Sequence, residues 1–200
     1  MAPEARRAQI VAAAGALISE RGFWGTSVQD VADACGLTVA GLLHHVGSKD
    51  GLLVAVLQHR DEADIRALMR ELGLALDDET PRGVEDVDLR GVSLARLCEA
   101  LVRRNATQPE IVRLYSVLEA ESLDAEHPAH AYFTARQRSV LEAFATAAPP
   151  TVADPDALAR HVLAAMDGLQ LQWLREPSVD LVAAWATIAR SVDGLAEPSA

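Results

Sequence analysis

The chain has few aromatic residues and no long uninterrupted apolar segment. Phe, Trp and Tyr make up 4% of its 200 residues, although half of all residues are hydrophobic. No apolar run approaches the roughly 18 residues that suggest a membrane-spanning helix, and we expect no signal peptide. We therefore expect a soluble, cytoplasmic protein that has no membrane partner.

Cysteines are scarce as well. Cys35 and Cys98 lie far apart in the sequence, which favours two buried free thiols over a disulfide. The chain contains no CxxC motif, no glycine-rich phosphate loop and no nucleophile elbow. We expect no cofactor, no metal and no catalytic residue.

Basic residues are outnumbered by acidic ones, and the net charge is -11. Such a charge argues against a nucleic-acid binder, which is usually basic. The first 50 residues, however, hold four cationic and five acidic side chains, so most of the negative charge lies elsewhere. An acidic protein with no affinity for nucleic acid remains the alternative.

The composition, rich in Ala and Leu, favours an all-α fold, since no run of alternating β-branched residues is long enough for a strand. Apolar residues at helical spacing predict a first helix over 3–21 and a long fourth helix over 48–76. Phe23 and Trp24 are expected to be core residues beneath the helices that follow. Arg6 and Arg7 are either phosphate contacts or ordinary surface.

The central stretch is 27–50, SVQDVADACGLTVAGLLHHVGSKD. Ser27 and Asp30 form a capping box, Gly36 supplies a left-handed turn, and Thr38 caps the next helix. Two short helices joined by a glycine-bearing turn predict a DNA-binding helix-turn-helix, whose second helix enters the major groove. The expected DNA-binding residues are Ser27, Thr38, Val39, Ala40, Gly41, Leu43, His44, His45 and Lys49.

Residues 7–53 resemble the N-terminal domain of the TetR family of bacterial repressors. The matching segments are AA-x-x-L-I-x-E-x-G-F, T-S-V-x-D-V-A-x-x-x-G-L and S-K-D-x-L-L. Leu43 stands where the family usually has a phosphate-binding tyrosine, and Val46 where it usually has phenylalanine. His44 or His45 could take over the missing contact. The resemblance implies a homodimer that binds a palindromic operator in double-stranded DNA and is released by a small-molecule effector.

The expected division is a helix-turn-helix domain over 1–48, a connecting helix over 49–76, and an effector-binding and dimerisation domain over 77–200. We expect five helices after residue 89 and a loop over the acidic segment 77–88. Family members usually bind their ligand among the C-terminal helices. The candidates, which combine apolar walls with a few polar groups, are Tyr115, Leu118, Glu119, Tyr132, Phe133, Met166 and Gln170.

The last two predicted helices are apolar on more than one face, as helices in a subunit interface are. A two-fold dimer with a four-helix bundle would cover both faces, while a plain monomeric core is the alternative. The expected interface residues are Leu158, Val162, Leu169, Trp173, Leu181, Trp185, Ile188 and Val192.

A polar cluster over 119–130 suggests the alternative function, a helical carrier or enzyme. It holds Glu119, Glu121, Asp124, Glu126, His127 and His130. The spacing is poor for a metal site, so we interpret Glu126 and His127 as residues that start a helix. The function we expect from the sequence is therefore a ligand-responsive repressor.

Overall fold

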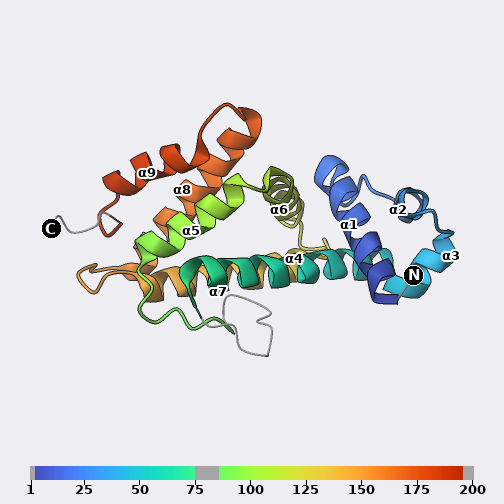
Figure 1. Ribbon diagram of the computed structural model, residues 1–200, viewed down its shortest axis with the longest axis horizontal. Helices are drawn as coiled ribbons and strands as arrows, with labels where there is room; N and C mark the ends of the chain where they lie inside the picture. Colours follow the sequence, from blue (N-terminus) through green and yellow to red (C-terminus); the bar gives the residue numbers. More distant parts are fainter. Residues whose placement is uncertain (1–2, 75–85, 196–200) are drawn as a thin grey trace. The chain divides into compact units, whose positions relative to one another are not determined.

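The computed structural model describes residues 3–74 and 86–195, and all regular elements in these ranges are helices. The first four are α1 (Pro3–Arg21), α2 (Val28–Cys35), α3 (Val39–Val46) and α4 (Lys49–Leu72). The next five are α5 (Leu94–Ala106), α6 (Pro109–Glu121), α7 (His130–Ala147), α8 (Pro155–Arg175) and α9 (Leu181–Ser191). Figure 1 shows them coloured along the chain. The predicted all-α class and the five helices after residue 89 are confirmed.

The chain forms two compact units. Unit 1 comprises Met1–Ala63 and Glu110–Thr134, and unit 2 comprises Asp64–Pro109 and Ala135–Ala200. Unit 1 takes in the first part of α4 and nearly all of α6, and the domain boundaries expected at residues 48 and 76 stay a prediction. The division is physical: the core of unit 1 unites α1–α3 with the buried side chains Leu114 and Leu118 of α6.

Helix α1 buries one stripe against α2 and α3. Ile10, Ala14 and Ile18 lie on it at helical spacing and are almost fully buried. They meet Val31 of α2 and Leu42 of α3, which are also fully buried. Burial of this kind, at about 25 cal/mol per Å² of apolar surface, is the main force that holds such short helices in place.

The fourth helix is shorter than the sequence suggested. It ends at Leu72, because Gly73 adopts a left-handed conformation with φ of +68°. The N–H of Leu74 then bonds to the carbonyl of Met69 at 2.9 Å, as at many helix ends. Leu76, the expected end, and most of the acidic segment 77–88 lie outside the described residues.

Turns and caps fix the start of three later helices. The seventh helix begins at His130, after residues 122–129, which form turns. Asp154 caps α8, whose first residue is Pro155. The ninth helix begins at Leu181, where Asp180 accepts the N–H of Ala183 at 3.0 Å. Within the described ranges, every helix is too short or too polar to cross a membrane.

Candidate DNA-binding site

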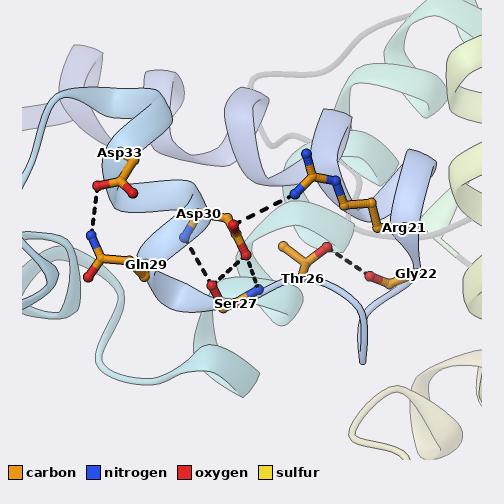
Figure 2. A network of polar contacts seen from close by, with 7 residues as sticks. All are labelled: Arg21, Gly22, Thr26, Ser27, Gln29, Asp30 and Asp33. Atoms are coloured by element: carbon orange, nitrogen blue, oxygen red, sulfur yellow. Dashed lines mark hydrogen bonds and ion pairs between the residues drawn. The ribbon is translucent and has the colours of Figure 1, made fainter.

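The start of α2 is fixed by a reciprocal pair of side chain and backbone bonds. Ser27 Oγ accepts the N–H of Asp30 at 3.0 Å, and Asp30 Oδ2 accepts the N–H of Ser27 at 2.8 Å. Figure 2 shows this capping box, with Arg21 3.6 Å from the other Asp30 oxygen. Two hydrogen bonds from Ser27 to the Asp30 carboxylate keep the pKa of Asp30 below its ordinary value. The bond from the hydroxyl has the largest influence, and the bond from the backbone N–H comes next. The predicted capping box is confirmed.

The turn between α2 and α3 depends on Gly36. This residue has φ of +64°, a left-handed value that only glycine adopts without strain. Its N–H donates to the carbonyl of Asp33 at 3.1 Å, and the N–H of Leu37 donates to the carbonyl of Ala32 at 2.9 Å. These bonds end α2 and redirect the chain so that α3 can begin after only three residues, 36–38, as a helix-turn-helix requires.

Helix α3 presents a surface of small side chains. Thr38 caps it by accepting the N–H of Gly41 at 3.1 Å, and Leu42 anchors it from the inner side. The other predicted contact residues of this helix are exposed or half-buried, so all remain available to a ligand. They are Val39, Ala40, Gly41, Leu43, His44 and His45. Small residues on such a face allow the helix backbone to approach base edges closely.

Two basic residues lie close to the ends of α3. Arg7 is exposed, and its guanidinium donates to the carbonyl of His45 at 3.5 Å, which is a long hydrogen bond. Lys49 follows α3 at the first position of α4, with its ammonium 4.3 Å from the centre of the Phe23 ring. Such cation–π contacts stabilise partly desolvated ammonium groups. A phosphate contact for these two residues stays a prediction.

The two aromatic residues before α2 occupy different environments. Phe23 is buried, as predicted, but Trp24 is 58% exposed. The prediction that both are core residues is therefore wrong for Trp24. The reason is the tight turn over 22–26, in which Thr26 Oγ1 donates to the carbonyl of Gly22 at 2.8 Å and is itself buried (Figure 2). A turn this short can place only one of two adjacent rings in the core.

The predicted effector residues do not lie together in one unit. Tyr115, Leu118, Glu119, Tyr132 and Phe133 belong to unit 1, whereas Met166 and Gln170 belong to unit 2. In unit 1 the hydroxyls of Tyr115 and Tyr132 both donate to the carboxylate of Asp61 on α4, the former at 2.7 Å. Glu119 is exposed. Sequence reasoning missed Asp61, which lies in a polar stretch of α4 that offers no periodic signal.

In unit 2 the two remaining effector candidates take part in local packing. Met166 is 4% exposed, and its carbonyl accepts the side-chain N–H of Gln170 at 3.2 Å. Gln170 Oε1 in turn accepts from Asn105 of α5 at 3.1 Å. The assignment of these residues to an effector site stays a prediction.

The polar cluster over 119–130 is organised as a turn. Asp124 accepts the N–H of Glu126 at 3.0 Å, and His127 Nδ1 accepts the N–H of Ala129 at 3.2 Å just before α7. His130 Nδ1 lies 2.7 Å from the carbonyl of Ser122. Across the part of the chain that is described, no group of three or more His, Cys, Asp or Glu side chains could hold a metal ion.

Most of the predicted interface residues are buried by the chain itself. Seven of the eight are less than 9% exposed in unit 2: Leu158, Val162, Leu169, Trp173, Leu181, Trp185 and Val192. The stripe chosen from the sequence is therefore the inner face of α8 and α9, which has little surface left for a partner. The outer face of α8 carries Leu171 at 43% exposure, and the assignment of the eight residues to a subunit interface stays a prediction.

Comparison with known proteins agrees with this geometry. Residues 10–56 match the sequence model described as "Bacterial regulatory proteins, tetR family". The HTH-type transcriptional repressor KstR2 of Rhodococcus jostii (strain RHA1) is 38% identical over 53 residues, which are 26% of each chain. The aligned stretch thus spans about a quarter of the length of this curated relative.

Solved structures extend the similarity of fold to the whole chain. NalD, the secondary repressor of the MexAB-OprM multidrug efflux pump in Pseudomonas aeruginosa, has a TM-score of 0.64 at 23% identity, with 95% of each chain covered. AibR, solved in complex with isovaleryl coenzyme A and operator DNA, has a TM-score of 0.63 at 22% identity, covering 92% of this chain and 97% of AibR. Residues 10–56, which hold the helix-turn-helix, are thus similar in sequence to the tetR family of bacterial regulatory proteins.

Proposed function

We propose that this protein is a transcriptional repressor that binds a palindromic operator as a homodimer and is released by a small molecule. The observation that carries the proposal is the capped α2–Gly36–α3 arrangement, with its small, accessible α3 face. The repressors KstR2 and NalD, similar in the N-terminal domain and in fold respectively, support it. On this proposal the chain acts by binding rather than as an enzyme.

The proposed contacts divide into two kinds. Side chains of α3, chiefly Thr38, Val39 and His44, would meet base edges in the major groove, where methyl groups can touch thymine. Arg7 and Lys49 would meet phosphates and so set the orientation of the helix. With few cations near α3, operator affinity should depend only modestly on salt concentration.

The proposed release from DNA requires that the dimer has two global conformations. A ligand bound among the C-terminal helices would favour a state in which the two recognition helices no longer match successive major grooves. AibR, with coenzyme A ester and operator in one crystal, shows that a protein of this fold can hold both kinds of molecule.

The proposal is tested with a labelled operator recovered by selection from random duplexes. Fluorescence anisotropy should show saturable binding that a small molecule from a metabolite library reverses. Thermodynamic linkage then requires that the operator weaken binding of that molecule by the same factor. If the protein binds the operator but no library compound alters the binding, the proposed release by a small molecule is contradicted. If the protein does not bind an operator at all, the proposed repressor function is contradicted.

The carrier or enzyme interpretation gains no observation of this kind. Its polar cluster is used in the turn before α7, where Asp124 and His127 bond to backbone N–H groups. Metal analysis of the purified protein would revive it if a bound ion were found in stoichiometric amount.

A further inference from the structure

A carboxylate from α6 holds the turn between α1 and α2. Phe23 donates its backbone N–H to Glu121 Oε2 at 2.7 Å, across 98 positions of sequence. Gly22 has φ of +73°, and a Cβ atom built there would lie 2.2 Å from Glu121 Oε1. Since any larger residue at position 22 would displace the carboxylate, Gly22 and Glu121 are matched to each other.

A buried histidine lies beside this carboxylate. His127 is 2% exposed, and its ring meets those of Phe23 and Trp24 edge to face, with centroids 5.1 Å and 5.4 Å away. Because Nδ1 accepts the N–H of Ala129, the neutral ring carries its hydrogen on Nε2. Among the described residues Nε2 has no hydrogen-bond partner, and it lies 3.8 Å from Glu121 Oε2.

The charged groups around His127 come from three segments. Burial, the largest influence, lowers the pKa of His127. Glu121 of α6, Asp124 of the turn and Asp50 of α4 act in the opposite direction, while Lys49 of α4 reinforces burial. The balance favours the neutral imidazole that the hydrogen bond from Ala129 requires.

We infer that Glu121 and His127 are positioning residues for DNA binding: Glu121 fixes the α1–α2 turn while His127 is neutral, and releases it when His127 gains a proton. The inference rests on the proposed repressor function. A protonated Nδ1 can no longer accept the N–H of Ala129. The positive ring would also attract the same Glu121 oxygen that now accepts the N–H of Phe23. Both changes loosen the turn that leads into the Ser27 cap of α2.

The test compares operator affinity at pH 8 and pH 6 for the wild-type protein, His127→Gln and His161→Gln. His161 is exposed on α8 and serves as the matched control. Between pH 8 and pH 6, wild type and His161→Gln should lose about twofold more affinity than His127→Gln, which has no titrating group at position 127. His44 and His45 are present in all three proteins, so their own contributions cancel in the comparison.

Two further variants test Glu121 at pH 8. Glu121→Ala leaves the N–H of Phe23 without its acceptor and should weaken operator binding by about fivefold or more. Glu121→Gln keeps an acceptor oxygen and should restore most of the affinity. Hydrogen exchange of the Phe23 amide should be slow in the wild type and in Glu121→Gln. It should be fast in Glu121→Ala.

Three outcomes would overturn the inference. One is a folded Glu121→Ala protein with wild-type operator affinity, and another is a His127→Gln protein with the wild-type pH profile. If Glu121→Ala does not fold, the His127→Gln profile alone decides. The third outcome is failure of the wild-type protein to bind any duplex, which would overturn the proposed function together with this inference. If the wild type binds an operator but has the same pH profile as His127→Gln, the inference alone is overturned.

Discussion

Gly22 is the residue at which the geometry of the α1–α2 turn can be probed with a single methyl group. Replacement by alanine would force a side chain into a left-handed conformation and into the Glu121 carboxylate, 2.2 Å from the new Cβ. We expect Gly22→Ala to lower the free energy of unfolding by about 1–3 kcal/mol. Urea denaturation measures this change.

The control for this substitution is Gly168→Ala. Gly168 lies within α8, and a Cβ added there would meet nothing within 4 Å. Alanine in an unhindered helix interior should stabilise the protein by roughly 0.5–1 kcal/mol. Equal effects of the two substitutions would contradict the account of the turn.

His127 should make stability depend on pH. Its pKa in the folded protein lies below the ordinary value, chiefly because of burial. Between these two pKa values the unfolded chain binds the proton more readily than the folded one does. The stabilisation is therefore complete above roughly pH 6.5, the ordinary pKa, and is lost as the pH falls below it.

Thermal unfolding between pH 7.5 and 5.5 measures this dependence. The melting temperature of the wild-type protein should fall more over this range than that of His127→Gln, which has no titrating group at this position. His161→Gln should follow the wild type. Parallel curves for wild type and His127→Gln would show that His127 is protonated as easily in the folded state as in the unfolded one.

At the scale of the element, Thr38 has two separable roles in α3. Its hydroxyl caps the helix by accepting the N–H of Gly41, and its methyl group is proposed to contact DNA. Thr38→Ala removes both and should cost about 0.5–2 kcal/mol of stability as well as operator affinity. Thr38→Ser keeps the hydroxyl, so it should retain most of the stability but lose the part of affinity that the methyl supplies.

Chemical denaturation and operator titration together separate these roles. Destabilisation by Thr38→Ser as large as that by Thr38→Ala would argue against the cap. Full operator affinity in both variants would remove Thr38 from the DNA contact.

The elements that the sequence predicted well are those with local signals. Ser27, Gly36 and Thr38 act on backbone groups within five positions, so their types alone indicate where α2 and α3 begin and end. The end of α4 carried the same kind of signal at Gly73, but Leu76, four positions after Leu72, extended the periodic pattern past it. The observed end shows that a glycine can outweigh continuing periodicity.

Contacts between distant segments left no such pattern. The bond from Phe23 to Glu121 joins residues 98 positions apart, and Asp61 meets two tyrosines from other helices. Each of these carboxylates looks in sequence like an ordinary surface residue. An apolar stripe is equally ambiguous, because Trp173 and Trp185 suit a subunit interface or the chain's own core. The structure buries both side chains within unit 2.

At the scale of the whole molecule, the proposed dimer should use the outer face of α8. Leu171 is 43% exposed there, and a charge at this position would be buried unpaired between subunits. We expect Leu171→Asp to shift the protein to monomers in sedimentation equilibrium. Leu123→Asp is the control, since Leu123 is 83% exposed in the turn after α6 and should leave the dimer intact. A Leu171→Asp protein that remains fully dimeric would place the interface elsewhere.

The most direct test of the central claim is selection of bound duplexes from a random library at low salt with the purified wild-type protein. We expect enrichment of a palindrome whose half-sites lie about one helical turn apart, or slightly more, because two α3 helices would occupy successive major grooves. No enriched sequence from a folded, dimeric protein would contradict it. The departure at Leu43 would then mark a chain with a repressor fold that does not read DNA.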